Sequence, residues 1–579
     1  MVFFDFEVFK YDWLVVAIDP INQREFKIVN NKNMLSDLYQ NYKRDIWVGF
    51  NCRNYDQYIL KGILCGFDPK RINDWIIVKD RKGWEFSSLF HKYPLNLFDI
   101  MPNPPVSLKT LEGFMGKNIH ETSVDFNIDR KLTEEEIRET IAYCRDDVMN
   151  TIEVFLRRKG EFDAQLDLLK AFDLPLSHLG KTQAQLAAVI LDAKKIRFKD
   201  DWDIRLPNNV QLGKYSEVAK WFLNKENHRD DAELKIIIAG LEHTIAWGGI
   251  HAGKKQYNYK CKPHEVILDI DVDQLYPTLM IVYGLLSRSV EEPERFKNVL
   301  DTSLRLKREG KKKEREPYKR ICNITYGAEG DAFNPMYDPL HRNLVCVFGQ
   351  VLIIDLLEKI EDLIELLQSN TDGIFIKLNR SDVPELKRRV EEWEKRTGLK
   401  MSYEAFTAIY QKDVNNYIAV PEGELYDEKG KPRWHSKGGY VKELTDLDYD
   451  LPIVNEAVKM YMLCGIPVET TVNSCDELKK FQKIVKLSNK YRWVEHENGE
   501  GTTKFDNKAY RVFASLDNRD GRLLKCDGVR NPAKFGNTPD RCFIYNDDIT
   551  NVAIPSKLDR QYYINLAKKR LEDFGVCQK

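Results

Sequence analysis

The sequence lacks an excess of either charge, because 89 lysines and arginines stand against 90 aspartates and glutamates. This balance excludes the strongly basic proteins that attract polyanions over their whole surface. No apolar run is long enough to span a membrane. The first residues, MVFFDFEVFKYDW, also lack the basic segment and apolar run of a signal peptide. We therefore expect a cytoplasmic protein that does not enter a membrane.

The 11 cysteines lack a pattern, since they form neither a CxxC pair nor a Cys/His cluster with zinc spacing. An odd count without pattern is typical of reduced thiols in a cytosolic compartment, and we expect no structural zinc. Internal repeats and low-complexity tracts are also missing from the sequence. With 579 residues the chain is too long for one hydrophobic core, so several domains are expected.

Local patterns near the N-terminus predict a mixed α/β domain. The runs at residues 2–8, 13–18 and 47–50 are rich in Val, Ile and aromatic side chains, which favour strands. Thr133 and Glu136 have the spacing of a capping box, which predicts a helix that begins there and continues to about residue 156. This alternation indicates a domain of about 160 residues.

The rest of the chain gives fewer signals. Residues 160–245 are expected to be mixed and mainly helical. Further on we expect a strand at 265–270, a helix at 317–326 with Pro317 near its first position, a helix at 344–366 and a strand at 373–377. After about residue 450 the pattern predicts helices and polar loops. The expected fold class is α+β with several domains.

Four acidic residues of the N-terminal domain are expected to meet in one place. Asp5 and Glu7 are two apart on a strand, so their side chains project from the same face. Tyr143 and Asp147 are four apart on the capped helix and are neighbours there, and Asp56 follows the third strand. Carboxylates that converge from a strand, a loop and a helix could hold two divalent cations for phosphodiester hydrolysis. Carboxylate oxygens suit Mg²⁺ or Mn²⁺.

Taken singly, each of these acids has a simpler interpretation as a surface residue or a helix cap. Asp5 and Glu7 are harder to explain in that way, because Phe3, Phe4 and Phe6 lie beside them in the same strand. Charged side chains in so apolar a strand need a partner, and a metal ion is one.

The segments DFE, NCRNYD and YCRDD resemble the three motifs of DEDD-type 3′→5′ exonucleases, in the variant that has a tyrosine four residues before the last aspartate. The resemblance implies that the metal ligands are Asp5, Glu7, Asp56 and Asp147. It also implies that Tyr143 positions the attacking water. Asp146 is the alternative to Asp147, and the Y-x-x-x-D spacing favours Asp147.

The same resemblance predicts contacts with single-stranded DNA. Ser107 and Leu108, within PVSLKTLEGF, resemble the single-strand-binding motif that lies between the second and third exonuclease motifs. Asn51 begins the second motif and is expected to contact the same strand of DNA.

A second group of residues lies in the middle of the chain. The segment EVILDIDVDQLYPTLM is an apolar strand that ends in Asp271. Pro277 lacks an N–H group and disfavours helix for the preceding Tyr276, so we expect a turn there. The sequence SNTDGIFIKL places Asp372 at a turn just before a strand, where it could share a metal ion with Asp271.

A basic segment and a helix lie between these two acids. Lys319, Asn323 and Tyr326 fall at i, i+4 and i+7 along one helix face, and a cation, an amide and an aromatic ring together suit a nucleotide. The plainer interpretation is an amphipathic helix whose polar face meets water. Residues 301–320 hold nine basic and four acidic side chains, a pattern of either a solvated face or a polyanion-binding face.

DVDQLYP, KRICNITYG and SNTDG resemble motifs A, B and C of family B DNA polymerases, in that order. The resemblance implies that Asp271 and Asp372 bind two Mg²⁺ ions and that Lys319 contacts the incoming triphosphate. It assigns Tyr276 a place under the sugar, where it excludes a 2′-hydroxyl. Tyr326 would pack near the templating base pair.

Residues 305–315 would form the first helix of the polymerase fingers, directly before motif B. Arg308 and Lys312 are four apart and are expected to contact phosphate, with Lys307 and Lys311 as the alternatives.

Three shorter matches concern the DNA duplex. Gly248 and Gly249, within WGGIH, resemble the Gly-Gly segment between exonuclease and polymerase domains, where glycine lets the backbone approach DNA. Lys437, which two glycines follow, resembles a primer-strand contact. Tyr417 lies where the family has a Lys-x-Tyr element.

Together the motifs imply an RNase H-like 3′→5′ exonuclease domain and a right-hand polymerase. The predicted ranges are 1–165 for the exonuclease domain, 166–245 for a connecting helical region, 246–300 and 331–450 for the palm, 301–330 for the fingers, and 451–579 for the thumb and C-terminal region. The implied partners are primer–template DNA, dNTPs and single-stranded DNA, with two Mg²⁺ or Mn²⁺ ions in each active site of a monomer. The compact fingers suggest the replicase of a phage or another mobile element.

Some positions depart from the family pattern and keep other functions open. Asn370 stands where motif C has its first aspartate, so an exonuclease with an inactive polymerase body is one alternative. A non-enzymatic DNA clamp is another, although it leaves the six retained acids unexplained. The short intervals between motifs leave no room for the insertions of protein-primed polymerases, so we expect extension of nucleic-acid primers; protein priming is the remaining alternative. Further departures are Gln274, Ile324, Gln350 and Asn415.

Overall fold

The computed structural model describes residues 1–499 and 501–576, which form two compact units. The first unit consists of Met1–Gly180, Leu444–Val454 and Thr471–Ile564, and the rest of the described chain forms the second. Sixteen α-helices and several sheets occur within the described residues, which confirms a mixed α+β fold with more than one unit. The finer ranges expected for exonuclease, palm, fingers and thumb stay predictions.

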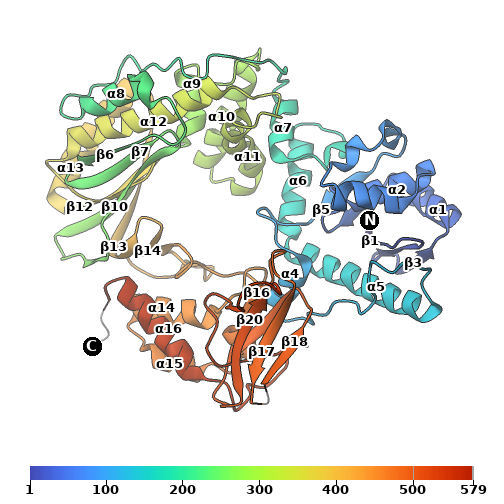
Figure 1. The fold of residues 1–579 in the computed structure, drawn as a ribbon. Coiled ribbons are helices and arrows are strands. Elements are labelled where there is room, and N and C mark those ends of the chain that lie inside the picture. The colour runs from blue at the N-terminus through green and yellow to red at the C-terminus, as the bar shows by residue number, and fades with distance from the viewer. Residues whose placement is uncertain (500, 577–579) are drawn as a thin grey trace. The chain divides into compact units, whose positions relative to one another are not determined.

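The N-terminal part of the first unit is built on a five-stranded sheet in the order β3-β2-β1-β4-β5 (Figure 1). Its strands are β1 (Val2–Val8), β2 (Trp13–Asp19), β3 (Arg24–Val29), β4 (Ile46–Gly49) and β5 (Asn96–Asp99). β1 pairs antiparallel with β2 and parallel with β4. The three strands predicted in this region are confirmed. So is the capped helix, because Thr133 and Glu136 form a capping box at the start of α5 (Glu134–Arg157).

The alternation of side chains along β1 decides which residues meet which helix. Phe4 and Phe6 are buried in a core with side chains of α1 (Lys32–Tyr42) and α2 (Asp56–Cys65). Phe3 points the other way and packs edge-on against Phe155 of α5, with ring centroids 5.2 Å apart. Asp5 and Glu7 share the face of Phe3, so β1 directs both carboxylates toward α5.

Two smaller sheets lie in the C-terminal part of the first unit, in the orders β16-β19-β22 and β18-β17-β20-β21. Their strands are β16 (Lys483–Lys486), β17 (Trp493–Asn498), β18 (Gly501–Phe505), β19 (Ala509–Ala514), β20 (Asp520–Cys526), β21 (Ala533–Lys534) and β22 (Cys542–Ile544). The prediction of helices and polar loops after residue 450 was therefore wrong for this region. These strands are short, and β18 is almost wholly exposed, so the sequence carries little apolar alternation there.

Arg511 of β19 connects the smaller sheets to α4 (Leu108–Met115), a helix of the N-terminal region. Its guanidinium is fully buried. Nη2 donates to the carbonyl oxygens of Lys117 at 2.7 Å and Gly113 at 3.2 Å, and Nη1 donates to Asp547 O at 2.7 Å. One side chain thus satisfies carbonyl groups at the C-terminal end of α4 from a strand nearly 400 residues away.

A ten-stranded sheet forms the centre of the second unit, in the order β15-β14-β13-β10-β12-β11-β8-β7-β6, with β9 paired to β13. Its strands are β6 (Glu233–Ile238), β7 (Leu241–Ala246), β8 (Gly249–Gly253), β9 (Tyr257–Lys260), β10 (Glu265–Val272), β11 (Glu365–Ser369), β12 (Gly373–Asn379), β13 (Met401–Asp413), β14 (Asn416–Pro421) and β15 (His435–Lys437). β10 and β12 confirm the two strands predicted in this part of the chain.

β6 and β7 lie in a stretch that was expected to be mainly helical, and they correct that expectation. They form a hairpin whose two loop residues, Ala239 and Gly240, have φ angles of 48° and 78°. Two positive φ angles are typical of the tight turns that match the twist of a hairpin. Asn-Gly or Asp-Gly would have marked such a turn, whereas Ala-Gly does not.

Two helices of the second unit differ from the prediction in their bounds. α12 (Pro339–Ile360) was expected at 344–366, but it ends at Ile360 and β11 follows. Leu363, Ile364 and Leu367 keep helical spacing from Ile360, so periodicity alone does not mark this end. α11 (Lys312–Glu329) begins before Pro317, which lies inside the helix, and its packing against α10 (Pro293–Arg308) overrides the local signal.

α9 (Leu275–Val282) includes Tyr276 and Pro277, so the expected turn is helical. Pro277 lies in its first turn, where N–H groups have no partner within a helix.

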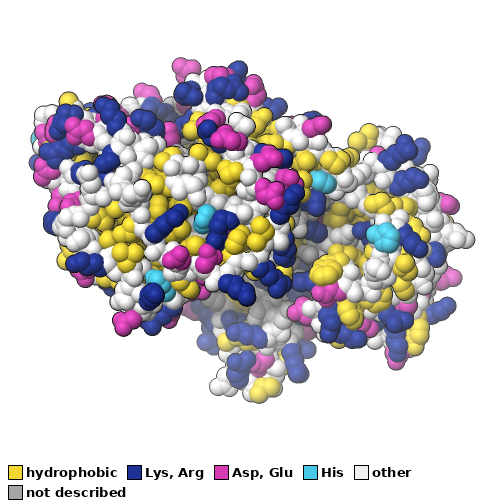
Figure 2. All heavy atoms as spheres, turned by 90° about the horizontal axis from the view of Figure 1, so that it is seen from above, with side chains coloured by type: hydrophobic (Ala, Val, Ile, Leu, Met, Phe, Trp, Pro, Cys, Tyr) yellow, Lys and Arg dark blue, Asp and Glu magenta, His cyan; other side chains and the backbone are white. Residues whose placement is uncertain are grey.

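The remaining helices are α3 (Pro69–Asn73), α6 (Lys159–Ala171), α7 (Gln183–Ile190), α8 (Ser216–Leu223), α13 (Val383–Thr397), α14 (Pro452–Cys464), α15 (Val468–Ser474) and α16 (Arg560–Asp573). Among the described helices, none combines the length and the apolar character that crossing a membrane requires. On the face that Figure 2 shows, basic and acidic side chains lie interspersed with apolar ones, in keeping with their near-equal numbers.

Candidate active sites

Four carboxylates of the first unit face one another; we call this group the N-terminal carboxylate site. Its members are Asp5, Glu7, Asp56 and Asp147. Burial raises the pKa of Asp5 well above its usual range, and the charges of Asp56, Glu7 and Asp147 raise it further. The structure therefore brings together all four acids that the exonuclease-like motifs single out, from β1, the start of α2 and the middle of α5.

Asp5 and Glu7 form the closest part of this site, with one neighbour that the sequence analysis missed. Oxygens of both carboxylates and the sulfur of Cys144 lie within 4.8 Å of one another. Cys144 Sγ donates to the backbone oxygen of Asp5 at 3.4 Å, and burial raises the pKa of this thiol. Neither carboxylate forms an ion pair with a basic side chain of residues 1–499 or 501–576, so the pair has the charge and the oxygen donors that a divalent cation requires.

Asp56 is held at the end of the β1–β4 pairing. The ladder between these strands covers Val2 and Phe3, and the backbone N–H of Phe6 donates instead to Asp56 Oδ1 at 3.2 Å. The side chain is almost fully buried, and burial raises its pKa to about 7. The hydrogen bond therefore fixes the position of a carboxylate that its surroundings disfavour in the ionised form.

Lys109 of α4 is a basic residue of this site that the sequence analysis also missed. Its Nζ lies 2.6 Å from Asp147 Oδ1, 3.2 Å from Glu112 Oε1 and 4.7 Å from the centre of the Tyr143 ring. Glu112 is buried, its Oε2 has no hydrogen-bond partner, and burial raises its pKa to about 7. Lys109 and Glu112 are three apart on a helix that follows Ser107 and Leu108, and this spacing is the signal that could have identified them.

The three residues expected to contact single-stranded DNA lie in the first unit, at the starts of helices or loops. Ser107 precedes α4 and its hydroxyl lies 2.8 Å from Thr110 Oγ1, while Leu108 is the first, half-buried residue of the helix. Asn51 has a positive φ of 58°, and its backbone N–H donates to Asp99 Oδ1 at 2.9 Å. Asp99, at the end of β5, thus positions the loop before Asp56 and is a residue that the motifs do not include.

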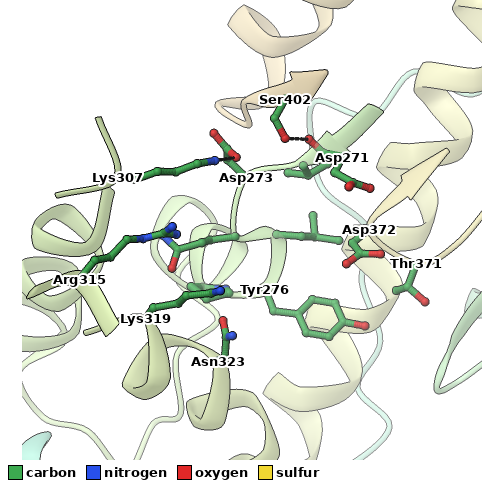
Figure 3. Close-up of a pocket in the computed structure, with 14 residues that line it drawn as sticks. Asp271, Asp273, Tyr276, Lys307, Arg315, Lys319, Asn323, Thr371, Asp372 and Ser402 are labelled. Atoms are coloured by element: carbon green, nitrogen blue, oxygen red, sulfur yellow. Dashed lines mark hydrogen bonds and ion pairs between the residues drawn. The ribbon is translucent and has the colours of Figure 1, made fainter. Parts of the chain in front are cut away.

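The second site lies in a cavity of about 740 Å³ in the second unit (Figure 3). Asp271, at the end of β10, and Asp372, in the turn before β12, lie on one side of it. Lys307 of α10 and two cations of α11, Arg315 and Lys319, lie on the other. We call this the palm-like cavity. Carboxylates and cations on opposite walls suit a ligand that carries both phosphate and a divalent cation.

Asp271 and Asp372 can approach each other because the residue that follows Asp372 is a glycine, whose missing side chain leaves room for the Asp271 carboxylate. A Cβ atom at Gly373 would lie 1.7 Å from Asp271 Oδ1. The backbone N–H of Val272 donates to Asp372 O at 2.9 Å, which fixes the turn against β10. Burial and the charge of Asp372 raise the pKa of Asp271 to about 6. The two acids of the polymerase-like motifs are therefore brought together.

The expected nucleotide contacts divide into two groups. Tyr276, Lys319 and Asn323 line the palm-like cavity. Arg308 instead lines a neighbouring cavity of about 430 Å³, and Lys312 lines neither of the two. Lys307, named as an alternative, and Arg315, which was not named, take their places on α10 and α11. Lys307 forms an ion pair with Asp273 on the cavity wall.

Tyr326 does not line the cavity but supports Tyr276. Their ring centroids are 4.3 Å apart, and Tyr326 Oη lies 2.7 Å from Cys346 Sγ on α12. Tyr276 Oη lies 3.7 Å from the same sulfur. Burial raises the pKa of both phenols, so both remain neutral. The ring of Tyr276 is thus held rigidly at the cavity.

The glycines of WGGIH have different surroundings. Gly249 has a φ of 151°, and a Cβ atom there would lie 2.4 Å from Thr371 Oγ1, beside Asp372. Close approach to this turn explains the glycine without any ligand. Gly248 faces open space.

Tyr417 and Lys437 lie directly opposite each other on β14 and β15. Tyr417 is buried and Lys437 is exposed. Burial, and then the charge of Asp269, raises the pKa of Tyr417 to about 12.

Comparison with known proteins finds no family model that matches the chain and no curated protein with a significantly similar sequence.

Proposed function

We propose that the chain is a template-directed DNA polymerase that extends nucleic-acid primers and removes mispaired 3′ ends with a 3′→5′ exonuclease site in its first unit. The palm-like cavity carries the proposal, because two carboxylates and three cations lie on opposite walls of a cavity of about 740 Å³. This volume lies in the range of small-ligand sites, and the arrangement suits a nucleoside triphosphate. The order of the six motifs along the chain supports the same function.

Mg²⁺ or Mn²⁺ fits both sites, because each offers carboxylate oxygens that repel one another and lack enough basic partners. The residues to hold the ions are Asp271 and Asp372 in the second unit, and Asp5, Glu7, Asp56 and Asp147 in the first. When bound, such an ion offsets charge on phosphate and lowers the pKa of the attacking hydroxyl or water.

The chain's own side chains bind and orient the nucleotide. Lys307, Arg315 and Lys319 bind its phosphates, and Asn323 is placed beside them on the same helix as Lys319. Because Tyr326 and Cys346 hold the Tyr276 ring in place, that ring forms a wall that excludes a ribose 2′-hydroxyl. The cavity is therefore selective for deoxynucleotides.

In the first unit, the mixed five-stranded sheet with helices on both faces supports an RNase H-like exonuclease domain. Lys109 holds Asp147 in position and offsets part of the negative charge of the site. Tyr143, with a neutral hydroxyl, orients the attacking water. Single-stranded DNA is the substrate of this site.

The test is extension of a labelled DNA primer on a longer template with Mg²⁺ and dNTPs. Asp372→Ala should abolish extension and leave trimming of the primer, whereas Asp5→Ala should abolish trimming and leave extension. Asp37→Ala, at an exposed acid of α1, is the matched control and should do neither.

Asn370 favours a second candidate, an exonuclease whose polymerase body is inactive, because it removes a carboxylate from the motif C turn. If the wild-type protein trims the primer under every dNTP and metal condition but never extends it, this candidate replaces the first. A protein offered in place of the DNA primer and accepted by the wild-type enzyme would instead indicate protein priming.

A further inference from the structure

The second unit contains another cavity, of about 690 Å³, that none of the roles described above uses. We call it the Tyr283 cavity. Its walls come from the loop at residues 205–209, the end of α9, the middle of α12 and the end of α13. It shares no lining residue with the palm-like cavity. Its volume lies in the range of small-ligand sites.

The described residues that line the Tyr283 cavity include three cations and no acid. Arg396 is balanced by buried Asp355, whose two oxygens each accept a hydrogen bond from the guanidinium at 2.7 Å. Arg205 and Lys395 are exposed, and within residues 1–499 and 501–576 neither forms an ion pair. Two free positive charges thus lie at a cavity without a balancing acid, an arrangement that favours an anionic ligand.

Hydrogen bonds fix the walls of the Tyr283 cavity. Asn209 Nδ2 donates to Arg396 O at 2.8 Å, which ties the loop to the end of α13. Tyr283 Oη lies 3.1 Å from Asn209 Oδ1 and 3.0 Å from Thr397 O, so it connects the end of α9 to both. The cavity is therefore formed before a ligand binds, which lowers the entropic cost of binding.

The same cavity offers surfaces that suit a nucleobase. The rings of Tyr283 and buried Phe348 pack edge-on, with centroids 5.3 Å apart, and Leu206 and Val282 add apolar wall. Asn208 is exposed, and within the described residues its side-chain amide forms no hydrogen bond. Aromatic and apolar side chains can pack against a base, and an amide can both donate to its edge and accept from it.

A cavity of about 430 Å³ adjoins the Tyr283 cavity and the palm-like cavity. It shares Gly398 with the first, and Asp273 and Lys307 with the second. Arg308 and Lys400 also line it, so it has three cations and one acid. Cations therefore line three neighbouring cavities of the second unit.

We propose that the Tyr283 cavity is a second nucleotide site, which binds a nucleoside phosphate with its phosphate at Arg205 and Lys395 and its base beside Tyr283 and Phe348. A free nucleotide and the end of a nucleic-acid strand both offer this chemistry. No carboxylate among the described lining residues could hold a divalent cation beside the phosphate, so the site binds its ligand without reacting with it. The inference goes beyond the proposed function and does not depend on polymerase activity.

The competing role for these cations is to stabilise a helix. Lys395 and Arg396 lie in the last turn of α13, where positive charge interacts favourably with the helix dipole. That role predicts that Lys395→Met lowers the melting temperature of the free protein and leaves nucleotide affinity unchanged. A binding role predicts that nucleotide affinity falls.

The experiment is calorimetric titration of the full chain in EDTA with dATP and, separately, with a single-stranded oligonucleotide of eight deoxyadenosines. Lys319→Met is present throughout, so that the palm-like cavity contributes less to the signal. The variants added to this background are Arg205→Met, Lys395→Met and the two together. Lys387→Met is the matched control, because Lys387 is an exposed lysine of the same helix that does not line the cavity.

We expect each single variant to weaken dATP binding by about 10-fold and the double variant by about 100-fold, since each removes a charge-assisted contact with phosphate. Lys387→Met should bind dATP as the background protein does. A loss of affinity for dATP identifies free nucleotide as the ligand, and a loss for the oligonucleotide alone identifies the end of a strand.

Two results overturn the inference. One is that the double variant binds both ligands as tightly as the background protein. The other is that the background protein binds neither ligand. The proposed function is tested separately by primer extension, so a protein that binds dATP through Arg205 and Lys395 but extends no primer would retain this inference and lose the polymerase.

Discussion

Gly373 is the residue at which strand β10 and the turn before β12 approach each other most closely in the candidate site. The β10 strand and the turn before β12 bring Asp271 and Asp372 together only because position 373 has no side chain. Glycine is needed here because it has no Cβ atom. Its conformational freedom is not the reason, since the backbone of Gly373 has ordinary strand geometry.

Gly373→Ala should therefore reduce primer extension by at least about 100-fold, because the new methyl group displaces the Asp271 carboxylate. Primer trimming, which belongs to the first unit, should stay unchanged. Gly160→Ala is the matched control, since nothing lies within 4 Å of a Cβ atom at this helix position. Extension at the wild-type rate by Gly373→Ala would show that Asp271 does not take part.

Lys109→Met tests the basic residue of the N-terminal carboxylate site. Removing its charge leaves Asp147 and buried Glu112 without their shared cation, so we expect trimming of single-stranded DNA to fall about 10- to 100-fold. Extension should be retained. Lys131→Met, at an exposed lysine of the same unit, is the control. Equal trimming by both variants would assign Lys109 a structural role only.

At this scale the sequence predicted the acids better than their partners. Asp5, Glu7, Asp56 and Asp147 were grouped correctly because strand and helix periodicity are local properties. Lys109 and Cys144 were missed. Lys109 has the i, i+3 spacing to Glu112 within α4, but its contact with Asp147 lies on another element, as does the contact of Cys144 with Asp5, and local spacing does not reveal such contacts. The same reason explains why Lys307 and Arg315, and not Arg308 and Lys312, line the palm-like cavity.

Among the elements, α5 depends most clearly on a local signal. Its N-terminus is fixed by the Thr133 capping box, and the helix carries Tyr143, Cys144 and Asp147 to the N-terminal carboxylate site. Thr133→Ala should lower the free energy of unfolding of the first unit by about 1 kcal/mol. Thermal melting followed by circular dichroism measures the change. Thr502→Ala, at an exposed threonine of β18 in the same unit, is the control, and an equal loss there would contradict the capping argument.

Elements with strong local signals were predicted, and those that depend on distant partners were not. β1, β2, β10, β12 and α5 have apolar alternation or a cap that acts within a few residues. The strands of the two smaller sheets, β16 to β22, have weak alternation and are stabilised by one another. The start of β11 fell within the helix predicted at 344–366, because Leu363, Ile364 and Leu367 keep helical spacing from Ile360.

For the molecule as a whole, stability without metal should depend on pH through the buried acids. The folded-state pKa of Asp56 is about 7, above its unfolded value of about 4. The folded state therefore keeps a proton that the unfolded state loses, so the contribution of Asp56 to stability falls as pH rises from about 4 to above 7.

In EDTA, the free energy of unfolding of Asp56→Asn relative to wild type should therefore increase by at least about 1 kcal/mol as the pH rises from 5 to 8. The amide oxygen can still accept the hydrogen bond from Phe6. Mg²⁺ should remove the gain, because the wild-type carboxylate then has its cation. Melting temperatures of both proteins at the two pH values, with EDTA or Mg²⁺, measure this. A difference that stays constant with pH would mean that Asp56 is ionised throughout.

Arg511 has a consequence for how the protein is made. On the ribosome, residues 1–180 emerge long before β19, yet carbonyl groups at the end of α4 have their hydrogen-bond donor on that strand. α4 carries Lys109 and Glu112, so the N-terminal carboxylate site of a nascent chain lacks this support until β19 has been translated. Copies that end before β19 should therefore form this site less completely than the full chain does.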